Sequence, residues 1–161
     1  YATEALTGKA IGARNPLRFR DAVRLSSIWA AGLSVAVGAV FWLTGGSVID
    51  AMTVNDAVRA LARDYLVWAA LAPVIGVACF QLDGIFIGAT RTRDMRNMML
   101  LSLAIYLLVW AALTPPLGNH GLWAALMILF ATRALTLSLR FPALKRDAFK
   151  NLSAASPSPR A

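Results

Sequence analysis

The stretch YLVWAALAPVIGVACFQLDGIFIGAT, residues 65–90, is apolar along almost its whole length and is followed at once by the arginine-rich RTRDMRN. Its single charged side chain is Asp83. A helix rises about 1.5 Å per residue, so this stretch is long enough to cross a hydrocarbon core of about 30 Å. It therefore predicts a membrane-spanning helix that carries one carboxylate and ends at a cluster of arginines.

Three other segments have the same character and nearly the same length. Residues 25–49 and 98–117 contain no charged side chain, and residues 121–139 contain only Arg133. The composition agrees, because 58% of the 161 residues are hydrophobic, 15% are charged and the mean hydropathy is positive. These features predict an all-α fold, a polytopic membrane helix bundle, rather than a soluble domain.

The remaining segments are expected to be an incomplete helix, connections and a tail. Residues 1–15 are typical of the end of a truncated transmembrane helix, and residues 16–139 are expected to hold the four-helix transmembrane region. Residues 140–161 predict a cytoplasmic tail, and their small, polar, proline-containing end is typical of disorder. In the connection before residue 65, we expect Thr53 to cap the second helix, with Asp56 three residues later.

The net charge of +8 is distributed between the apolar segments instead of along one face. One cluster precedes the first span, a second joins the second span to the third, and another follows the fourth, whereas the alternate loops hold only Arg59 and Arg63. Because Lys and Arg resist translocation, the basic loops and the C-terminus are expected to be cytoplasmic. This pattern predicts a multi-pass protein of the plasma membrane, in bacteria the inner membrane, and no nucleic-acid partner. The clustered residues are Lys9, Arg14, Arg18, Arg20, Arg24; Arg91, Arg93, Arg96; Arg140, Lys145, Arg146, Lys150 and Arg160.

Small side chains at helical spacing predict close contacts between helices. Gly84 and Gly88 form GIFIG in the second span, and a stripe spaced by four residues runs along the first. Small residues let helix backbones approach closely in lipid, although such stripes also line substrate paths. The stripe consists of Ser26, Ala30, Ser34 and Gly38.

Asp83 and Arg133 are expected at similar depths in the membrane. Asp83 is about 12 Å from Arg91 along a helix axis, and Arg133 is about 10 Å from Arg140. An ionisable group at such depth indicates a functional site that faces a bundle interior or a wet cavity, the alternative being a structural bond between helices. Arg133 either pairs with Asp83 or extends its long side chain to the cytoplasmic interface.

The other residues on the Asp83 face are small or weakly polar. Gly76, Cys79 and Thr90 lie about one or two turns away, which predicts a column suited to a cavity wall. Gln81 lies on another side and either bonds a neighbouring helix or contributes to a site. Glu4 is a further candidate, at a depth that suggests membrane.

No catalytic residues or metal ligands are predicted. The sequence has no HExxH, P-loop, GxSxG or Cys/His metal set, so we expect no enzyme activity, no metal site and no cofactor. His120 lies in the short loop PPLGNHGLW and is assigned no role.

Three segments resemble the multidrug and toxic compound extrusion (MATE) transporters, and within them the DinF-like branch: YATEALTGKAIGARNP, LDGIFIGATRTRDMRN, and LGNHGLWAAL followed by Arg133. The resemblance implies a twelve-helix protein with two six-helix lobes around a central cavity. This chain would be most of the second lobe, from the end of the eighth helix through the twelfth.

The resemblance also implies a function, namely cation-coupled antiport that exports drugs or toxic organic compounds by alternating access. The coupling ion would be a proton or sodium, and Asp83 matches an acidic residue of the tenth helix that contributes to the cation site in related members. Gln81, Glu4 and Arg133 are further candidates for ion coupling or substrate binding. The expected partners are the lipid bilayer, the missing N-terminal lobe and small organic substrates. The alternative is a non-transporting membrane scaffold in which Asp83 and Arg133 hold helices together.

Overall fold

The computed structural model describes residues 2–153, which form five helices and no strand. Four of the helices are long and apolar enough to cross a membrane, and they contain the four predicted spans except for the last two residues of 65–90. The all-α prediction is therefore confirmed, whereas the end of the tail, residues 154–161, lies outside the described residues. The helices are α1 (Ala2–Gly12), α2 (Pro16–Met52), α3 (Asp56–Gly88), α4 (Thr92–Leu117) and α5 (Asn119–Ser153).

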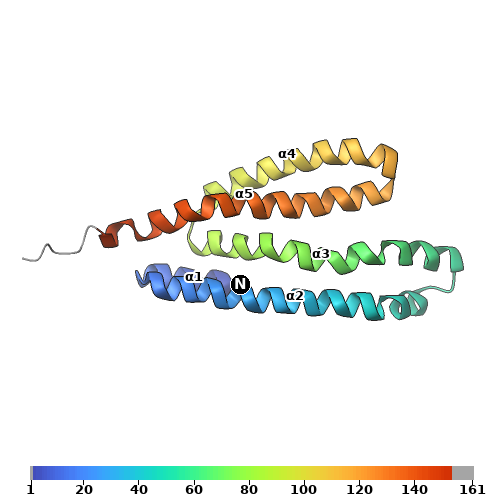
Figure 1. Ribbon diagram of the computed structural model, residues 1–161, viewed down its shortest axis with the longest axis horizontal. Coiled ribbons are helices and arrows are strands. Elements are labelled where there is room, and N and C mark those ends of the chain that lie inside the picture. The colour runs from blue at the N-terminus through green and yellow to red at the C-terminus, as the bar shows by residue number, and fades with distance from the viewer. Residues whose placement is uncertain (1, 154–161) are drawn as a thin grey trace, which may run out of the picture.

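The long helices form two antiparallel hairpins, α2 with α3 and α4 with α5, that meet where α3 packs against α5 (Figure 1). The short α1 packs against both α2 and α3. The α1–α2 and α3–α4 connections and the C-terminal part of α5 lie at one end of the bundle, which we term the basic end (Figure 1). The α2–α3 and α4–α5 connections lie at the opposite end. This alternation brings the basic clusters of the sequence to a single end.

Helix α2 begins where the sequence offers an asparagine followed by a proline. The Oδ1 atom of Asn15 accepts a hydrogen bond from the Arg18 N–H at 2.9 Å, and Pro16 occupies the first turn. An asparagine side chain satisfies an N–H that has no partner inside the helix, and proline has no N–H to satisfy there. Helix α2 therefore starts well before its apolar segment and carries several arginines on its first turns.

The prediction that Thr53 caps the next helix is wrong. Asn55 is the N-cap of α3, and its Oδ1 accepts from the N–H groups of Ala57 and Val58 at 3.0 and 3.3 Å. Thr53 instead ends α2, where its N–H donates to the Ile49 carbonyl and its hydroxyl accepts from the Asn55 N–H. Thr53 and Asn55 are both residue types that cap helices. Asn55 directly precedes Asp56, and its side chain reaches the free N–H groups of the first turn.

Thr90 does not belong to the Asp83 face, contrary to the sequence prediction. Helix α3 ends at Gly88, and Thr90 follows with a φ of 56°, in the left-handed region. The Arg91 N–H then donates to the Phe86 carbonyl at 2.9 Å, which closes the end of the helix. The chain therefore turns before Thr90, and α4 starts only a few residues later.

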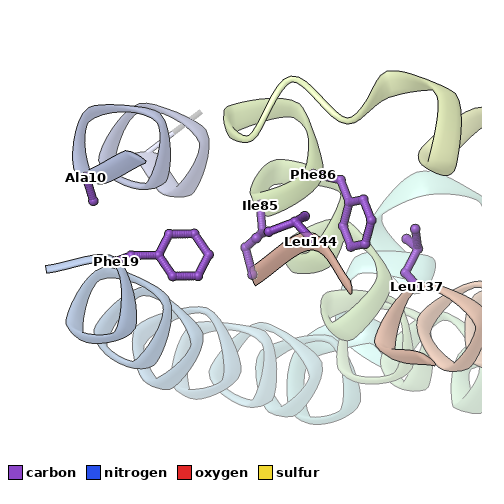
Figure 2. Close-up of a cluster of buried hydrophobic side chains, with 6 residues drawn as sticks. All are labelled: Ala10, Phe19, Ile85, Phe86, Leu137 and Leu144. Carbon is purple, nitrogen blue, oxygen red and sulfur yellow. The ribbon is translucent and has the colours of Figure 1, made fainter. Parts of the chain in front are cut away.

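A cluster of buried apolar side chains joins four helices near the basic end. Figure 2 shows its members, which come from α1, α2, α3 and α5. The ring of Phe19 packs edge-on against Phe149 with 5.6 Å between centroids and stacks with Phe141 at 6.3 Å. The cluster attaches the start of α2 to the C-terminal part of α5. Its buried members are Ala10, Phe19, Ile85, Phe86, Leu137 and Leu144.

Small residues bring α2 and α3 together, as the stripe on the first span predicts. Ser34 and Gly38 are buried. A Cβ atom at Gly38 would lie 2.6 Å from the Ala70 carbonyl oxygen, closer than real Cβ atoms approach such an atom. The absence of a side chain at Gly38 is therefore what allows the two backbones to meet at this depth.

The GIFIG motif of α3 packs against α1. A Cβ atom at Gly84 would lie 3.4 Å from the Thr3 Cβ, and one at Gly88 would lie 2.5 Å from the Glu4 carbonyl oxygen. Gly8 of α1 faces Gly88 in the same way, at 3.2 Å from its carbonyl oxygen. Both glycines of the motif thus serve helix packing.

Candidate functional site

Asp83 and Arg133 form an ion pair between α3 and α5. The distance between Arg133 Nη2 and Asp83 Oδ2 is 2.9 Å, and the two side chains are 16% and 12% exposed. Of the two alternatives left open by the sequence, the structure shows the pair and not an arginine extended to the interface. Each charge offsets the unfavourable free energy of placing the other in an apolar span.

The pair does not satisfy all of its polar atoms. Asp83 Oδ1 and Arg133 Nε are buried, and neither has a hydrogen-bond partner among residues 2–153. Most buried side-chain polar atoms do have a partner, and an unsatisfied one costs about 1–3 kcal/mol. One acceptor and one donor of the same ion pair are therefore available to a group other than a neighbouring side chain.

The face of α3 that carries Asp83 packs against α5. Cys79, one turn earlier, is fully buried. A Cβ atom at Gly76 would lie 3.5 Å from Cδ2 of Phe130 in α5. These residues hold the carboxylate at the contact between the two hairpins.

A cavity of about 410 Å³ lies between α2, α3 and α5, on a different face of α3 from Asp83. Its wall is almost entirely apolar, and its polar side chains are Gln81, Ser27 and Ser138. The predicted column of Gly76, Cys79 and Asp83 does not line this cavity. The cavity wall contributed by α3 consists of Val77, Ala78, Gln81, Leu82 and Ile85.

Gln81 links three helices through its amide group. Its Oε1 accepts from Thr3 Oγ1 of α1 at 2.9 Å, and its Nε2 donates to Ser26 Oγ and Ser27 Oγ of α2 at 2.6 and 3.1 Å. Both donors and one acceptor position of the amide are thus occupied by neighbouring helices. This arrangement favours the interpretation of Gln81 as a bond between helices, although it also borders the cavity.

Glu4 lies on α1 beside the GIFIG motif and not in the ion pair. Its backbone carbonyl accepts from Thr7 Oγ1 at 3.2 Å, and its N–H group lies close to Gly84, the residue after Asp83. Within residues 2–153, its carboxylate has no Lys, Arg or His partner within 4 Å. The backbone of Glu4 therefore packs in this part of the bundle, but no basic side chain of the described residues pairs with its carboxylate.

His120, to which no role was assigned from the sequence, joins α5 to α3 at the opposite end of the bundle. Trp68 Nε1 donates to His120 Nδ1 at 3.0 Å, and the His120 ring lies 4.7 Å from the Tyr65 ring between centroids. Because the indole N–H can only donate, this bond requires an imidazole with a free Nδ1 lone pair. In the sequence, the spacing of Tyr65 and Trp68 places both side chains on one helix face, and this was the available signal for a contact there.

Asp50, near the end of α2, pairs with the two arginines in the first turns of α3. Arg63 Nη2 lies 2.6 and 2.7 Å from the two Asp50 carboxylate oxygens. Arg59 donates to the carbonyl oxygens of Thr53 and Asp50 at 2.7 and 3.0 Å. Arg59 thus satisfies carbonyls at the end of α2, and the Asp50 carboxylate partly neutralises both arginines.

The bundle of long apolar helices agrees with the comparison to known proteins. The family model MatE matches residues 1–113, which include α1 to α3, most of α4 and Asp83. The chain belongs to the MatE family. Members of the MatE family are multi-pass membrane transporters and not enzymes, so the described helices are those of a multi-pass membrane protein.

A relative of known sequence is DNA damage-inducible protein F of Escherichia coli (strain K12). It is 40% identical over 138 residues, which cover 86% of this chain and 30% of that protein. The chain thus spans about a third of the length of this MatE relative. No solved structure matches the chain. Among residues 2–153, no group of three or more His, Cys, Asp or Glu side chains is arranged to hold a metal ion.

Proposed function

We propose that this chain is part of a cation-coupled antiporter that exports drugs or toxic organic compounds by alternating access. Membership of the MatE family supports transport. The observation that carries the proposal is the buried Asp83–Arg133 pair, in which one carboxylate oxygen has no partner among the described residues. A carboxylate at this depth is costly, and a transporter has a reason to keep it.

In the proposed mechanism, a proton or sodium ion competes with Arg133 for Asp83. In the conformation described here, Arg133 neutralises the carboxylate and holds α5 against α3. When Asp83 takes the cation, Arg133 loses its partner and the contact between the two hairpins weakens. The cation shifts the balance between conformations by the difference in its affinity for them, about 1.4 kcal/mol for each tenfold difference.

The orientation follows from the charge distribution. The basic end is proposed to face the cytoplasm, with the C-terminus on that side, and the end with Asp50 and His120 to face outward. The membrane is the plasma membrane, in bacteria the inner membrane. Asp83 then lies in the cytoplasmic half of its helix.

The exposed apolar side chains of the bundle support two of the proposed partners, membrane lipid and the rest of the polypeptide. Trp29 and Leu43 of α2 and Leu108 of α4 are each more than 70% exposed. Such residues suit contact with lipid tails or with the N-terminal lobe, the second partner in the proposal. Small organic substrates are the third, and the 410 Å³ cavity beside Gln81 has the volume and apolar lining of a small-molecule site.

The second candidate function is a membrane scaffold without transport. The 2.9 Å distance between Asp83 and Arg133 favours it, because a purely structural tie between hairpins has the same geometry. The two functions make different demands on Asp83 and Arg133. A scaffold needs only that no buried charge is left unpaired, whereas coupling needs a carboxylate that changes its partner.

The test uses full-length protein with Asp83→Asn, Arg133→Gln and both substitutions together. Membrane abundance and drug efflux are measured across pH, with and without sodium. We expect the double variant to accumulate as the wild type does, since no charge is left unpaired, and to lose most gradient-driven efflux. If the double variant restores both abundance and ion-dependent efflux, the pair is structural and Asp83 has no part in coupling.

A matched control separates loss of coupling from loss of any tie between helices. Asp50→Asn with Arg63→Gln removes another ion pair between neighbouring helices, at the opposite end of the bundle, whose side chains are 43% and 49% exposed. An exposed pair contributes about 0–1 kcal/mol, so this control should keep efflux. Loss of efflux in the control as well would attribute the effect to helix packing in general.

A further inference from the structure

A groove at the basic end lies between the start of α2 and the last turns of α5. It has a volume of about 740 Å³ and is lined mainly by charged residues. Pro16 and Pro142 form part of the wall, and Phe149 contributes an aromatic ring. The charged residues of the wall are Lys145, Arg146, Asp147 and Lys150.

The charge of this groove is more positive than its lining suggests at first. The one carboxylate, Asp147, forms a salt bridge with Arg91 from the α3–α4 connection, so its charge is neutralised locally. Lys145, Arg146 and Lys150 are exposed, and none of them forms a salt bridge within residues 2–153. The N-terminus of α2 adds the positive end of a helix dipole at Pro16. The groove therefore presents three cations to an anionic ligand.

The position of the groove along the membrane normal indicates which kind of anion it meets. Lys145 lies six residues beyond Leu139, the last residue of the apolar segment, which is about 9 Å along the helix axis. The polar headgroup layer extends about 5–8 Å beyond the hydrocarbon core on each side, within reach of long basic side chains. Phosphates of membrane lipids are concentrated at this level, and the aromatic ring of Phe149 offers an apolar contact beside them.

We propose that the groove formed by Pro16, Pro142, Phe149 and the three basic residues of α5 binds the phosphate headgroup of an anionic phospholipid. Zwitterionic lipids carry an amine that cancels the phosphate charge, so the site selects lipids of net negative charge. The bound headgroup would also bridge the start of α2 and the end of α5, the same helices that Phe19 and Phe149 join. The proposal goes beyond transport and does not depend on how Asp83 is used.

The experiment measures binding of phosphatidylglycerol and phosphatidylcholine to the purified full-length protein by native mass spectrometry. The groove variant is Lys145→Gln/Arg146→Gln/Lys150→Gln. The control variant, Arg93→Gln/Arg96→Gln/Arg140→Gln, removes the same charge from exposed positions at the basic end that do not line the groove. Each basic side chain at a membrane surface is worth about fivefold in affinity for anionic lipid, so the groove variant should lose more than tenfold for phosphatidylglycerol.

The wild type and the control variant are expected to prefer phosphatidylglycerol to phosphatidylcholine, and the groove variant to lose that preference. An equal loss in both variants would show diffuse attraction to the surface and overturn the site. Inorganic phosphate is added as a competitor, and displacement of the lipid at millimolar phosphate would overturn a lipid headgroup as the ligand.

A second measurement needs no variant and so does not depend on whether the groove variant folds. A phosphatidylglycerol analogue with a photoreactive headgroup is crosslinked to the wild type, and the labelled peptides are identified. Labelling of residues 142–150 or of the first turn of α2 supports the proposal. Labelling confined to other basic segments, such as residues 91–96, contradicts it.

Discussion

Asp83 and Arg133 each place a charge in an apolar span, and each is tolerated because the other lies 2.9 Å away. The pair is neutral as a whole, yet one oxygen and one nitrogen have no partner among residues 2–153. At the same scale, Gln81 has three hydrogen-bond partners from two other helices. Polar residues that look alike in the sequence therefore differ in how completely their neighbours satisfy them, and the incompletely satisfied pair is the candidate for function.

Removing only one partner of the pair should destabilise the protein. Arg133→Gln leaves a buried carboxylate without its cation, which typically costs about 3–5 kcal/mol. Asp83→Asn with Arg133→Gln should recover most of that loss. Thermal unfolding of full-length protein in detergent checks this, and a double variant no more stable than Arg133→Gln would show that the two residues are not coupled.

The hydrogen bond between Trp68 and His120 should contribute modestly to the contact of α3 with α5. Trp68→Phe removes the donor and His120→Leu removes the acceptor, and each should lower stability by about 0.5–1.5 kcal/mol. Because both changes delete the same bond, their combination should cost less than the sum. Strict additivity in the same unfolding assay would argue against a direct interaction.

At the scale of the helices, α3 is the central element, since it packs against α1, α2 and α5 (Figure 1). The contacts with α1 and α2 lie at different heights along the helix, and the contact with α5 lies on another face. Gly84 and Gly88 meet α1, Ala70 meets α2, and the face of Asp83 meets α5. Since lipid tails give no hydrophobic drive for helices to associate, close packing and polar bonds must hold α3 in place.

The glycine at the α2–α3 contact offers a direct test of packing. Gly38→Ala places a Cβ atom 2.6 Å from the Ala70 carbonyl oxygen, a backbone atom that cannot move aside easily. The resulting strain should destabilise the protein by about 1–3 kcal/mol.

Gly32→Ala is the matched control on the same helix. A Cβ atom there meets nothing within 4 Å, so the change should be neutral or stabilising by up to about 1 kcal/mol from helix propensity. Both variants are compared by unfolding of the full-length protein. Equal effects at the two positions would show that α2 and α3 do not approach as the structure has them.

At the scale of the whole molecule, the two ends of the bundle differ in charge. The end with the α2–α3 connection pairs its two arginines with Asp50, whereas the basic end keeps an excess of Lys and Arg beyond the Arg91–Asp147 bridge. The antiparallel arrangement of the hairpins produces this asymmetry, because it places alternate connections at the same end (Figure 1). The asymmetry is the basis for the proposed orientation in the membrane.

Cysteine labelling in intact cells checks this orientation. Cys79 is the only cysteine of these 161 residues and is buried, so a full-length background in which Cys79 and every other cysteine is replaced by serine leaves a single introduced thiol. A membrane-impermeant maleimide should label Asp56→Cys from outside and should label Arg93→Cys only after the cells are opened. The reverse pattern would invert the proposed orientation.

The sequence alone determined which segments form helices long and apolar enough to cross a membrane, because hydrocarbon thickness makes about 20 consecutive apolar residues a local signal. It also determined how far Asp83 and Arg133 lie along their helices from Arg91 and Arg140, which depends only on the rise per residue. Their pairing was left open, because it depends on how α5 is rotated and packed against α3. Contacts far apart in the chain set that rotation, among them Phe130 beside Gly76. The same reason explains why Thr90 lies outside the Asp83 face and why the partners of Gln81 are on α1 and α2. Where a helix ends and which helices it contacts depend on packing between distant segments, which no short stretch of sequence specifies.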